Sequence, residues 1–355
     1  MTRFGFILHP LDVSDIGRKY AFARCLPNSW VEAALGVMPV QDCGRITGVR
    51  SEAGAETEGW FVGCPLTARQ LLNGDPDKCT DKIVKACNVA ADLGAEVVGL
   101  GAFTSIVGDK GLTIADRVKI GVTTGNSFTT ATGLEGTLLA AQRMGLDPLQ
   151  GTAVILGATG SIGKIAAKLL APQVGRLVLV GRNRDTLEQL VAELGNPANV
   201  TVETDLTTAL RDADMIVAVT SSIEAIVQPE HLKPGAVVCD IARPRDVSKR
   251  VAEERDDVLV IEGGAVALPG HPNIEFNFGF PPGMVYACMA ETMLLALEGR
   301  TGDYSLGADL KQEQVEEMAG LGKKHGFKLG GFRSFERQLT DEDIEAIRRR
   351  AEAKR

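Results

Sequence analysis

The sequence has no excess of basic residues, no long apolar run and few aromatic side chains. Its 38 Lys and Arg stand against 46 Asp and Glu, a net charge of −8. Proteins bind a nucleic-acid backbone by replacing its counterions with Lys and Arg, so this balance argues against a nucleic-acid ligand. No stretch reaches the ~20 apolar residues of a membrane helix, and the first residues lack the apolar core of a signal peptide. We therefore expect no nucleic-acid partner and no membrane span.

The cysteines also lack a recognisable pattern. They form no CxxC pair, and no histidine stands at ligand spacing from them; they occupy positions 25, 43, 64, 79, 87, 239 and 288. An odd set of this kind encodes neither a disulfide framework nor a zinc site. We expect a reducing, cytoplasmic setting and no bound metal.

Glycine, in contrast, is abundant, with 40 of the 355 residues. Glycine permits positive φ and close approach of the backbone, so this number indicates many turns between short elements. The length and the 45% of hydrophobic residues suit two globular domains.

The middle of the chain alternates short apolar runs with helical patterns. The runs are Thr152–Leu156, Leu177–Val180, Val200–Glu203, Met215–Val219, Ala236–Asp240 and Val258–Ile261. Continuous apolar runs of this length are typical of buried parallel strands. Helical spacing of apolar residues separates them in Ser161–Leu170 and Asp185–Leu194. The pattern predicts an α/β fold with a doubly wound Rossmann dinucleotide-binding domain at residues 148–283.

The flanking parts are predicted as an N-terminal α/β substrate domain, residues 1–147, and a C-terminal helical segment, residues 284–355. Strands are predicted at Phe4–Leu8, Gly59–Val62 and Glu96–Leu100, helices at Asp75–Leu93 and Thr130–Met144, and a hairpin or mobile loop at Arg45–Glu58. The C-terminal helices are predicted at Met284–Glu298, Asp309–His325 and from Thr340 onward.

A glycine-rich turn follows the first strand of the middle domain and opens a helix. Its residues are Gly157, Thr159, Gly160, Ser161, Ile162 and Gly163. Glycines in this context allow a tight turn and close approach of a pyrophosphate, which faces the helix N-terminus. The alternative is a turn whose glycines serve packing only. Within a βαβαβ unit we favour dinucleotide binding, and we add Thr220, which follows the strand Met215–Val219, to the candidate cofactor residues.

The end of the second strand favours NADPH over NADH. It carries Arg182, Asn183 and Arg184 and no acid. An NAD site usually has Asp or Glu there for the ribose 2′-hydroxyl, whereas arginine accommodates a 2′-phosphate. The alternative is that the two arginines only solvate the start of the next helix.

Cys288 is the cysteine with the best physical case for reactivity. It stands in the first turn of the helix predicted after Gly283, where unpaired N–H groups and the helix dipole favour a thiolate. The alternative for any one cysteine is a small buried hydrophobic residue. Glu291, one turn further on, is a candidate proton donor. The alternative is that its carboxylate only serves the helix to which it belongs.

Two loops of the N-terminal domain combine small residues with hydroxyl and backbone N–H groups. One contains Phe103, Thr104 and Ser105, and the other contains Gly125, Asn126 and Ser127. Such loops suit a wall beside a cofactor or a thioester. Helix capping by Thr and Ser is the alternative, so these residues are candidate substrate contacts only.

Four segments together resemble the long-chain acyl-ACP reductases of cyanobacteria, which form fatty aldehydes. They are Gly101–Ile106, Thr124–Ser127, Gly157–Gly163 and Tyr286–Leu295, within a similarity that runs from Phe4 to about Phe327. The resemblance implies that Cys288 attacks the thioester of an acyl carrier protein or of coenzyme A, and that the acyl-enzyme is reduced by NADPH. It also implies an acyl carrier protein as partner and an aldehyde-deformylating oxygenase as a second one.

The sequence departs from that family in three places. They are the loop His271–Pro282, Phe128 where a histidine is expected, and the basic tail 330–355. An acidic carrier needs a local basic patch on this acidic protein. The candidates are Arg243, Arg245, Lys249 and Arg250, or the arginines 348–350.

Two other interpretations stay open. The domain order is also similar to that of shikimate and amino-acid dehydrogenases, which transfer hydride directly with the help of Lys and Asp. Lys85, Asp116 and Lys119 are the candidates for that role. A cofactor-bound sensor without turnover is the third interpretation.

Overall fold

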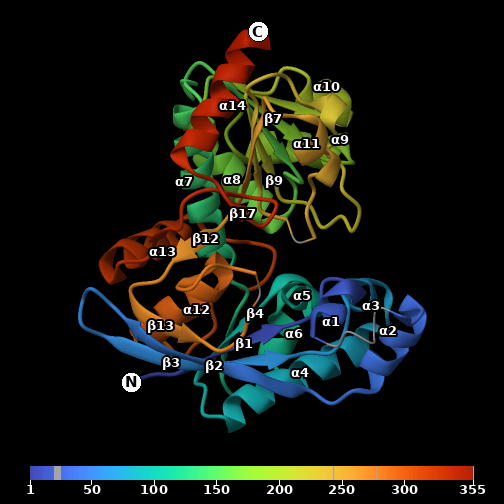
Figure 1. The fold of residues 1–355 in the computed structure, drawn as a ribbon, viewed down its shortest axis with the longest axis vertical. Helices are drawn as coiled ribbons and strands as arrows, with labels where there is room; N and C mark the ends of the chain where they lie inside the picture. The colour runs from blue at the N-terminus through green and yellow to red at the C-terminus, as the bar shows by residue number, and fades with distance from the viewer. Residues whose placement is uncertain (20–24, 243, 278, 355) are drawn as a thin grey trace. The chain divides into compact units, whose positions relative to one another are not determined.

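The computed structural model describes residues 1–19, 25–242, 244–277 and 279–354, and the chain forms two compact units (Figure 1). Unit 1 comprises Met1–Phe128, Ala267–Asp309 and Glu317–Lys328, and unit 2 comprises Thr129–Val266, Leu310–Glu316 and Leu329–Arg355. Each unit therefore combines segments that are distant in the sequence.

Unit 1 is built on a six-stranded sheet in the order β13-β2-β3-β1-β4-β5. Its strands are β1 (Phe4–Leu8), β2 (Gln41–Arg50), β3 (Glu56–Gly63), β4 (Val97–Leu100), β5 (Gly121–Thr123) and β13 (Gly270–Ile274). Strands β3, β1, β4 and β5 are parallel, and their carboxyl ends lie along one edge. β2 pairs antiparallel with both β3 and β13, so the region 45–58 is a hairpin, as the first of the two predicted alternatives stated.

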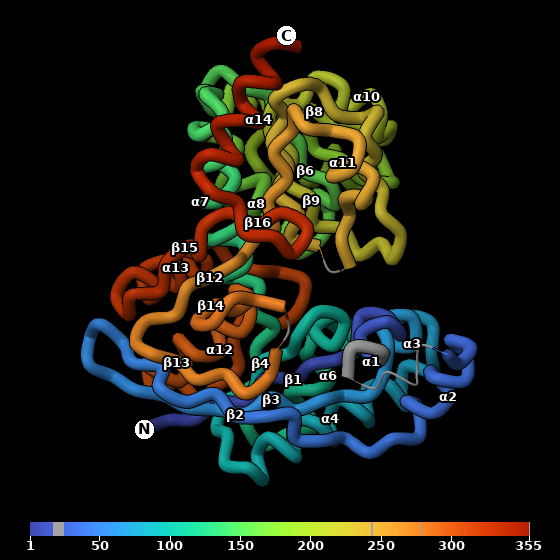
Figure 2. The backbone as a smooth tube through the Cα atoms, in the orientation of Figure 1, coloured from blue at the N-terminus to red at the C-terminus, as the bar shows by residue number. Residues whose placement is uncertain are grey.

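Helices pack on both faces of this sheet, and unit 1 contains other helices that do not lie on it. The helices of unit 1 are α1 (Val13–Lys19), α2 (Asn28–Val37), α3 (Ala68–Asn73), α4 (Pro76–Asp92), η2 (Ala102–Ser105), α5 (Val107–Lys110), α6 (Leu112–Ala115) and α12 (Ala287–Leu297), with the starts of α7 (Asn126–Arg143) and most of α13 (Gln312–His325). The backbone trace in Figure 2 shows α4 and α12 on opposite sides of the sheet.

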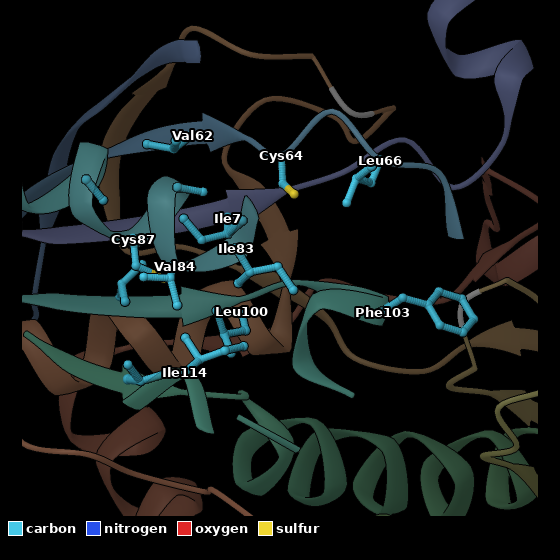
Figure 3. Close-up of a cluster of buried hydrophobic side chains, with 14 of the residues drawn as sticks. Ile7, Val62, Cys64, Leu66, Ile83, Val84, Cys87, Leu100, Phe103 and Ile114 are labelled. Atoms are coloured by element: carbon cyan, nitrogen blue, oxygen red, sulfur yellow. The ribbon is translucent and has the colours of Figure 1, made fainter. Parts of the chain in front are cut away.

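The alternation of side chains along β4 explains this sandwich. Leu100 points toward α4, where it packs with Ile7 and Ile83 in a buried apolar cluster (Figure 3). The preceding residue, Gly99, faces α12, and a Cβ atom on it would come 2.1 Å from Thr292 Oγ1. Glycine at this position lets α12 lie directly on the strand. Almost every residue of α12 is buried, including Glu291 and Thr292, so the helix lies within the core of unit 1.

Unit 2 contains the predicted Rossmann sheet. Its strands are β6 (Thr152–Leu156), β7 (Arg176–Val180), β8 (Val200–Glu203), β9 (Met215–Ala218), β10 (Val237–Asp240) and β11 (Leu259–Glu262). All six are parallel in the order β11-β10-β9-β6-β7-β8, so the strand order reverses between β6 and β9. This is the doubly wound arrangement of dinucleotide-binding domains, and it confirms the predicted fold class.

Helices cover both faces of the second sheet. α8 (Ser161–Leu170), α9 (Arg184–Glu193) and the body of α7 pack on one face, and α10 (Leu206–Leu210) and α11 (Lys249–Glu254) pack on the other. The C-terminal helix α14 (Asp341–Lys354) inserts Ile344 and Ala351 between α7 residues Ala140 and Met144 and the strands β10 and β11. The C-terminal tail is therefore part of the core of unit 2.

Some boundaries differ from those that the sequence suggested. The helix expected at Met284–Glu298 begins at Ala287, because Met284–Tyr286 is the strand β14. The apolar run is continuous across that junction, so periodicity gives no sign of the change. The domain boundary expected at 147 falls inside unit 2, because α7 packs into the Rossmann core. Residues 284–355, expected as one segment, are divided between the units.

Within the described ranges, no helix is both long enough and apolar enough to cross a membrane.

Candidate active site

Burial removes four of the seven cysteines as nucleophiles. The buried ones are Cys64, Cys79, Cys87 and Cys239. Burial raises the pKa of the Cys64 thiol to about 12 and also raises the pKa of Cys87. Thiols in such surroundings stay protonated and unreactive at neutral pH. The partly buried Cys288, in contrast, lies at the start of a helix.

Cys288 is the second residue of α12. The N-cap position is Tyr286, whose side chain does not cap the helix. The first turn of a helix presents N–H groups with no partner inside the helix, and the dipole adds a partial positive charge there. The structure thus places the Cys288 sulfur where an anion is favoured, at the position in the first turn that the sequence predicted.

The turn at Gly125 packs directly against Cys288. Gly125 has φ +76°, and a Cβ atom at this residue would lie 2.2 Å from the Cβ and 2.3 Å from the Cα of Cys288. Any side chain would displace the cysteine, and only glycine adopts this backbone conformation without strain. The chain therefore brings β5 and its following loop to the start of α12, as expected if both regions serve one site.

Glu291 lies one helical turn beyond Cys288 and is completely buried. The Thr123 hydroxyl donates to its Oε1 at 2.6 Å, and the Phe128 amide donates to its Oε2 at 2.8 Å. Burial raises the pKa of the Glu291 carboxyl, against the hydrogen bonds that lower it. The contacts tie the carboxylate to the end of β5 and the start of α7, rather than to its own helix as the second predicted alternative stated.

Ser305 completes this network, and no sequence pattern predicted its role. Its carbonyl accepts from the Thr124 hydroxyl, and its hydroxyl lies 2.6 Å from the Ser127 hydroxyl. Ser305 has φ +52°, an uncommon conformation for a residue other than glycine. The two hydroxyls thus bond to each other inside the protein rather than facing solvent. The helix expected from Thr130 begins at Asn126, so Asn126 and Ser127, expected in a loop, form the first turn of α7.

The loop that follows β4 is shaped by His9 at the end of β1. His9 Nε2 accepts from the Phe103 amide at 3.0 Å, and its Nδ1 lies 2.9 Å from the Pro10 carbonyl, so the ring is neutral with the proton on Nδ1. Burial lowers the pKa of His9 to about 4. The adjacent Ala102 has φ +47°, a strained conformation that the surrounding contacts must hold.

The hydroxyls predicted in this loop serve the loop itself. Thr104 Oγ1 donates to the Gly101 carbonyl at 2.8 Å, and Ser105 Oγ donates to the Ala102 carbonyl at 2.6 Å. The Phe103 side chain is buried. Their contact with a substrate stays a prediction. The loop nevertheless lies at the carboxyl edge of the sheet, where open α/β sheets bind their ligands.

The glycine turn of unit 2 has the geometry that a pyrophosphate requires. Gly157 has φ +82°, and a Cβ atom at Gly163 would come 2.2 Å from the Gly157 carbonyl oxygen. Gly163 thus allows α8 to approach the turn closely. Gly160 is the N-cap residue of α8 and carries no side chain over its first N–H groups. The cradle therefore fits a nicotinamide dinucleotide, with Thr159, Ser161 and Ile162 around it.

The end of β7 presents an exposed basic surface. Arg182 is exposed and has no ion pair among the described residues. Asn183 caps α9 by accepting from the Thr186 amide at 3.2 Å, and Arg184 lies 3.8 Å from Glu188. Arg182 is available for an anionic ligand. Arg184 could also bind one, because it would have to break only its exposed ion pair with Glu188. The 2′-phosphate contact of these arginines stays a prediction.

Thr220 lies across the switch point from the glycine turn. Its Cα would lie 3.2 Å from a Cβ atom at Gly157. Its hydroxyl and its amide both donate to the carboxylate of Asp246, whose pKa is raised by burial. The hydroxyl is therefore held within the protein. Asp246, which fixes this wall of the cofactor cradle, was not predicted because it follows no recognisable motif.

The basic clusters expected to contact a carrier are mostly paired with acids. Arg245 bonds Glu262, and Arg250 bonds Glu254. The C-terminal arginines pair with Glu352, Glu345 and Asp256. Arg243 lies outside the described residues. Such pairing lowers the local positive potential that would attract an acidic carrier.

The Lys and Asp residues proposed for direct hydride transfer do not lie together at the carboxyl edge of the unit 1 sheet. Asp116 and Lys119 are exposed and precede β5, so they lie at the amino end of that strand. Lys85 is exposed in the middle of α4. Among the described residues, no group of three or more His, Cys, Asp or Glu is arranged to hold a metal ion.

Comparison with known proteins adds independent information on this site. Residues 139–262 match the family described as shikimate / quinate 5-dehydrogenase. The aminotransferase PigE of a Serratia species is 32% identical over 98% of this chain and 42% of its own length, so the chain spans less than half of that relative. A glutamyl-tRNA reductase of Natronomonas pharaonis is 31% identical over 47% of this chain and 37% of its own length.

A further relative matches over most of its own length. The long-chain acyl-[acyl-carrier-protein] reductase of Synechococcus elongatus is 30% identical over 82% of this chain and 87% of its own length. The match covers both the glycine cradle and most of the rest of the chain. This chain therefore belongs to the family of the long-chain acyl-[acyl-carrier-protein] reductase, among the NAD(P)-dependent oxidoreductases with a shikimate dehydrogenase-like nucleotide-binding domain.

Proposed function

We propose that this protein reduces long-chain acyl thioesters to fatty aldehydes with NADPH, through an acyl-enzyme on Cys288. The observation that carries the proposal is the position of Cys288 in the first turn of α12, directly against the Gly125 turn. The similarity of this chain to an acyl-[acyl-carrier-protein] reductase supports the same substrate class. The other cysteines of the sheet core are buried and protonated, so they offer no competing nucleophile there.

In the first step, the Cys288 thiolate attacks the carbonyl carbon of the thioester. A C–S bond forms to Cys288, the C–S bond to the carrier breaks, and the carrier thiolate leaves and takes up a proton. Exchange between two thioesters is nearly isoenergetic, so the protein has to orient the groups and stabilise the oxyanion. The amide groups of the first turn of α12 are the candidate donors to that oxyanion.

NADPH, when bound, would supply a hydride to the acyl carbon. The turn Gly157–Gly163 would hold its pyrophosphate at the start of α8. Arg182 and Arg184 would hold its 2′-phosphate, since guanidinium groups pair well with phosphate oxygens. Reduction leaves a hemithioacetal alkoxide on Cys288.

The alkoxide then collapses without a dedicated proton donor. The C–S bond breaks, its electron pair returns to Cys288, and the aldehyde is released. A thiolate is a good leaving group, so this step places no demand on a general acid. That agrees with the site, because His9 is neutral with both ring nitrogens engaged and Glu291 is enclosed by its own hydrogen bonds.

Two alternatives are less well supported. A dehydrogenase with direct hydride transfer requires Lys and Asp at the carboxyl edge, and the exposed positions of Lys85, Asp116 and Lys119 do not favour this. A sensor without turnover predicts that NADPH binds but is not oxidised with any acyl thioester. Both alternatives leave Cys288 without a chemical role.

Trapping the acyl-enzyme tests the proposal directly. The protein is incubated with acyl thioester and without NADPH, and the peptides are analysed by mass spectrometry. We expect an acyl group on Cys288, no adduct and no activity with Cys288→Ser, and an unchanged adduct with Cys43→Ser, a partly buried cysteine on β2. A fully active Cys288→Ser variant would refute the proposal.

The carrier and the product partner belong to the proposal as well. The substrate carrier is an acyl carrier protein, with coenzyme A as the alternative, and an aldehyde-deformylating oxygenase is the proposed consumer of the product. NADPH oxidation is measured with acyl carrier protein and coenzyme A thioesters of graded chain length, and the aldehyde is identified. Turnover only with coenzyme A esters would rule out the carrier protein.

A further inference from the structure

A continuous chain of hydrogen bonds joins Glu291 to the turn beside Cys288. The Gly125 amide donates to Thr123 Oγ1 at 3.2 Å, and the Thr123 hydroxyl in turn donates to Glu291 Oε1 at 2.6 Å. Thr123 is completely buried, as is Glu291. The backbone of Gly125 is thus fixed through one hydroxyl to a carboxylate on the same helix as the nucleophile.

The second oxygen of Glu291 fixes the other end of the loop. Its Oε2 accepts from the Phe128 amide at 2.8 Å, near the start of α7. The buried carboxylate therefore caps the positive end of α7 while it holds the turn that precedes it. A carboxylate so enclosed accepts several hydrogen bonds and has no open side from which to deliver a proton.

We propose that Glu291 is a positioning residue that sets the Gly125 backbone against Cys288, and that it does not donate a proton in the reaction. The Gly125 backbone sits where a Cβ atom would be 2.2 Å from the Cys288 Cβ, so a small shift of the turn changes the space around the sulfur. The catalytic importance of the contact between Gly125 and Cys288 rests on the proposed function. The link between Glu291 and the surroundings of the Cys288 sulfur is independent of that function.

The test compares two variants that break the chain in different ways. Glu291→Gln removes the charge and one acceptor, whereas Thr123→Val keeps the carboxylate and removes only the hydroxyl. Thr123→Ser keeps the hydroxyl and is the matched control. If Glu291 acts by position, the first two variants slow single-turnover acylation of Cys288 by about tenfold, the double variant is no slower, and Thr123→Ser stays near wild type.

Alkylation of Cys288 by iodoacetamide gives a readout that needs neither thioester nor NADPH. Its rate is followed against pH, where the midpoint reports the thiol pKa and the plateau reports access to the thiolate. We expect the same change of plateau in Glu291→Gln and Thr123→Val, of about threefold or more, and no change in Thr123→Ser. If the wild type forms no acyl-enzyme, the proposed function fails while this measurement still decides the role of Glu291.

Two results would overturn the inference. An unchanged plateau in Thr123→Val, with a shifted midpoint in Glu291→Gln alone, would assign Glu291 a purely electrostatic effect. Normal acylation and alkylation in Glu291→Gln, combined with a lost acidic limb in the pH profile of aldehyde release, would make it the proton donor. If Glu291→Gln does not fold, Thr123→Val with its serine control carries the test alone.

Discussion

Gly125 shows how one residue position can be restricted by two independent requirements. Its positive φ excludes side chains through local backbone strain, and the adjacent Cys288 excludes them through direct overlap. Gly54 shares the first restriction, with φ +89°, but a Cβ atom there would meet nothing within 4 Å. The two glycines therefore allow the effect of backbone strain to be separated from the effect of the contact with Cys288.

Alanine at the two positions is predicted to have different effects. Gly54→Ala should lower the free energy of unfolding by about 1 kcal/mol through strain alone and leave acylation unchanged. Gly125→Ala should cost about 3 kcal/mol or more and reduce acylation of Cys288 at least tenfold, because the methyl group displaces the cysteine. Urea unfolding and the mass of the acyl adduct measure the two effects. Equal behaviour of both variants would contradict the steric role of Gly125.

His9 makes the stability of unit 1 depend on pH. Its pKa is lowered to about 4 by burial, so the unfolded chain binds a proton at His9 between about pH 6.5 and pH 4 while the folded chain does not. The contribution of His9 is fully present above pH 6.5 and is lost as the pH falls toward 4. We expect His9→Asn to flatten this part of the stability curve, measured by urea unfolding at several pH values. Equal slopes in His9→Asn and in the wild type would contradict this role of His9.

At the scale of elements, the turn after β7 is where the preference for NADPH over NADH is predicted to arise. Arg182→Ala combined with Arg184→Ala should raise the KM for NADPH about tenfold or more and leave the KM for NADH almost unchanged. The reason is that only NADPH carries the 2′-phosphate that the guanidinium groups would bind. Arg176→Ala, an exposed arginine at the opposite end of β7, is the matched control. An equal rise for both cofactors would rule out the 2′-phosphate contact.

The Rossmann strands and the helices α8 and α9 could be predicted to within about a residue, whereas the short helices α10 and α11 were not predicted. Parallel strands that are covered on both faces have uninterrupted apolar sequences, as in Thr152–Leu156. The glycine turn after this strand marks the start of the next helix. Short or edge strands carry no such signal. β5 has only three residues, and β13 includes Pro272, which fits an edge strand.

The site was predictable where a residue's role is local and not where it depends on distant contacts. The position of Cys288 in a helical turn and the small residue Gly125 in a loop are visible in the sequence. Ser305, His9 and Asp246 act through bonds to segments far away in the chain, and nothing next to them in the sequence indicates those partners. Tertiary contacts of this kind require the folded structure.

At the scale of the whole molecule, each unit is completed by segments that return to it late in the chain. The sheet of unit 1 would lack a cover on one face without α12, because α4 covers only the opposite side. Thr123 and Glu291, which bond each other in the site, are 168 residues apart. Contiguous domains were therefore a poor description, and the C-terminal residues belong to the cores rather than to an appendage.

A buried cluster around Glu262, at the end of β11, tests whether the C-terminal residues belong to the core of unit 2. Arg333, almost fully buried in the tail, lies 3.5 Å from Glu262 Oε2, and the Arg245 guanidinium and the Glu336 amide each lie 2.8 Å from Oε1. Arg333→Ala removes the cation beside Oε2 while Arg245 still pairs with Oε1, so the variant should lower the stability of unit 2 by about 2 kcal/mol rather than by the full cost of an uncompensated buried charge. The tail around residues 329–339 should then exchange its amide hydrogens faster than in the wild type. Arg349→Ala, which removes only a surface pair with Glu345, should stay within about 0.5 kcal/mol of the wild type, and similar losses in both variants would contradict the anchoring role of Arg333.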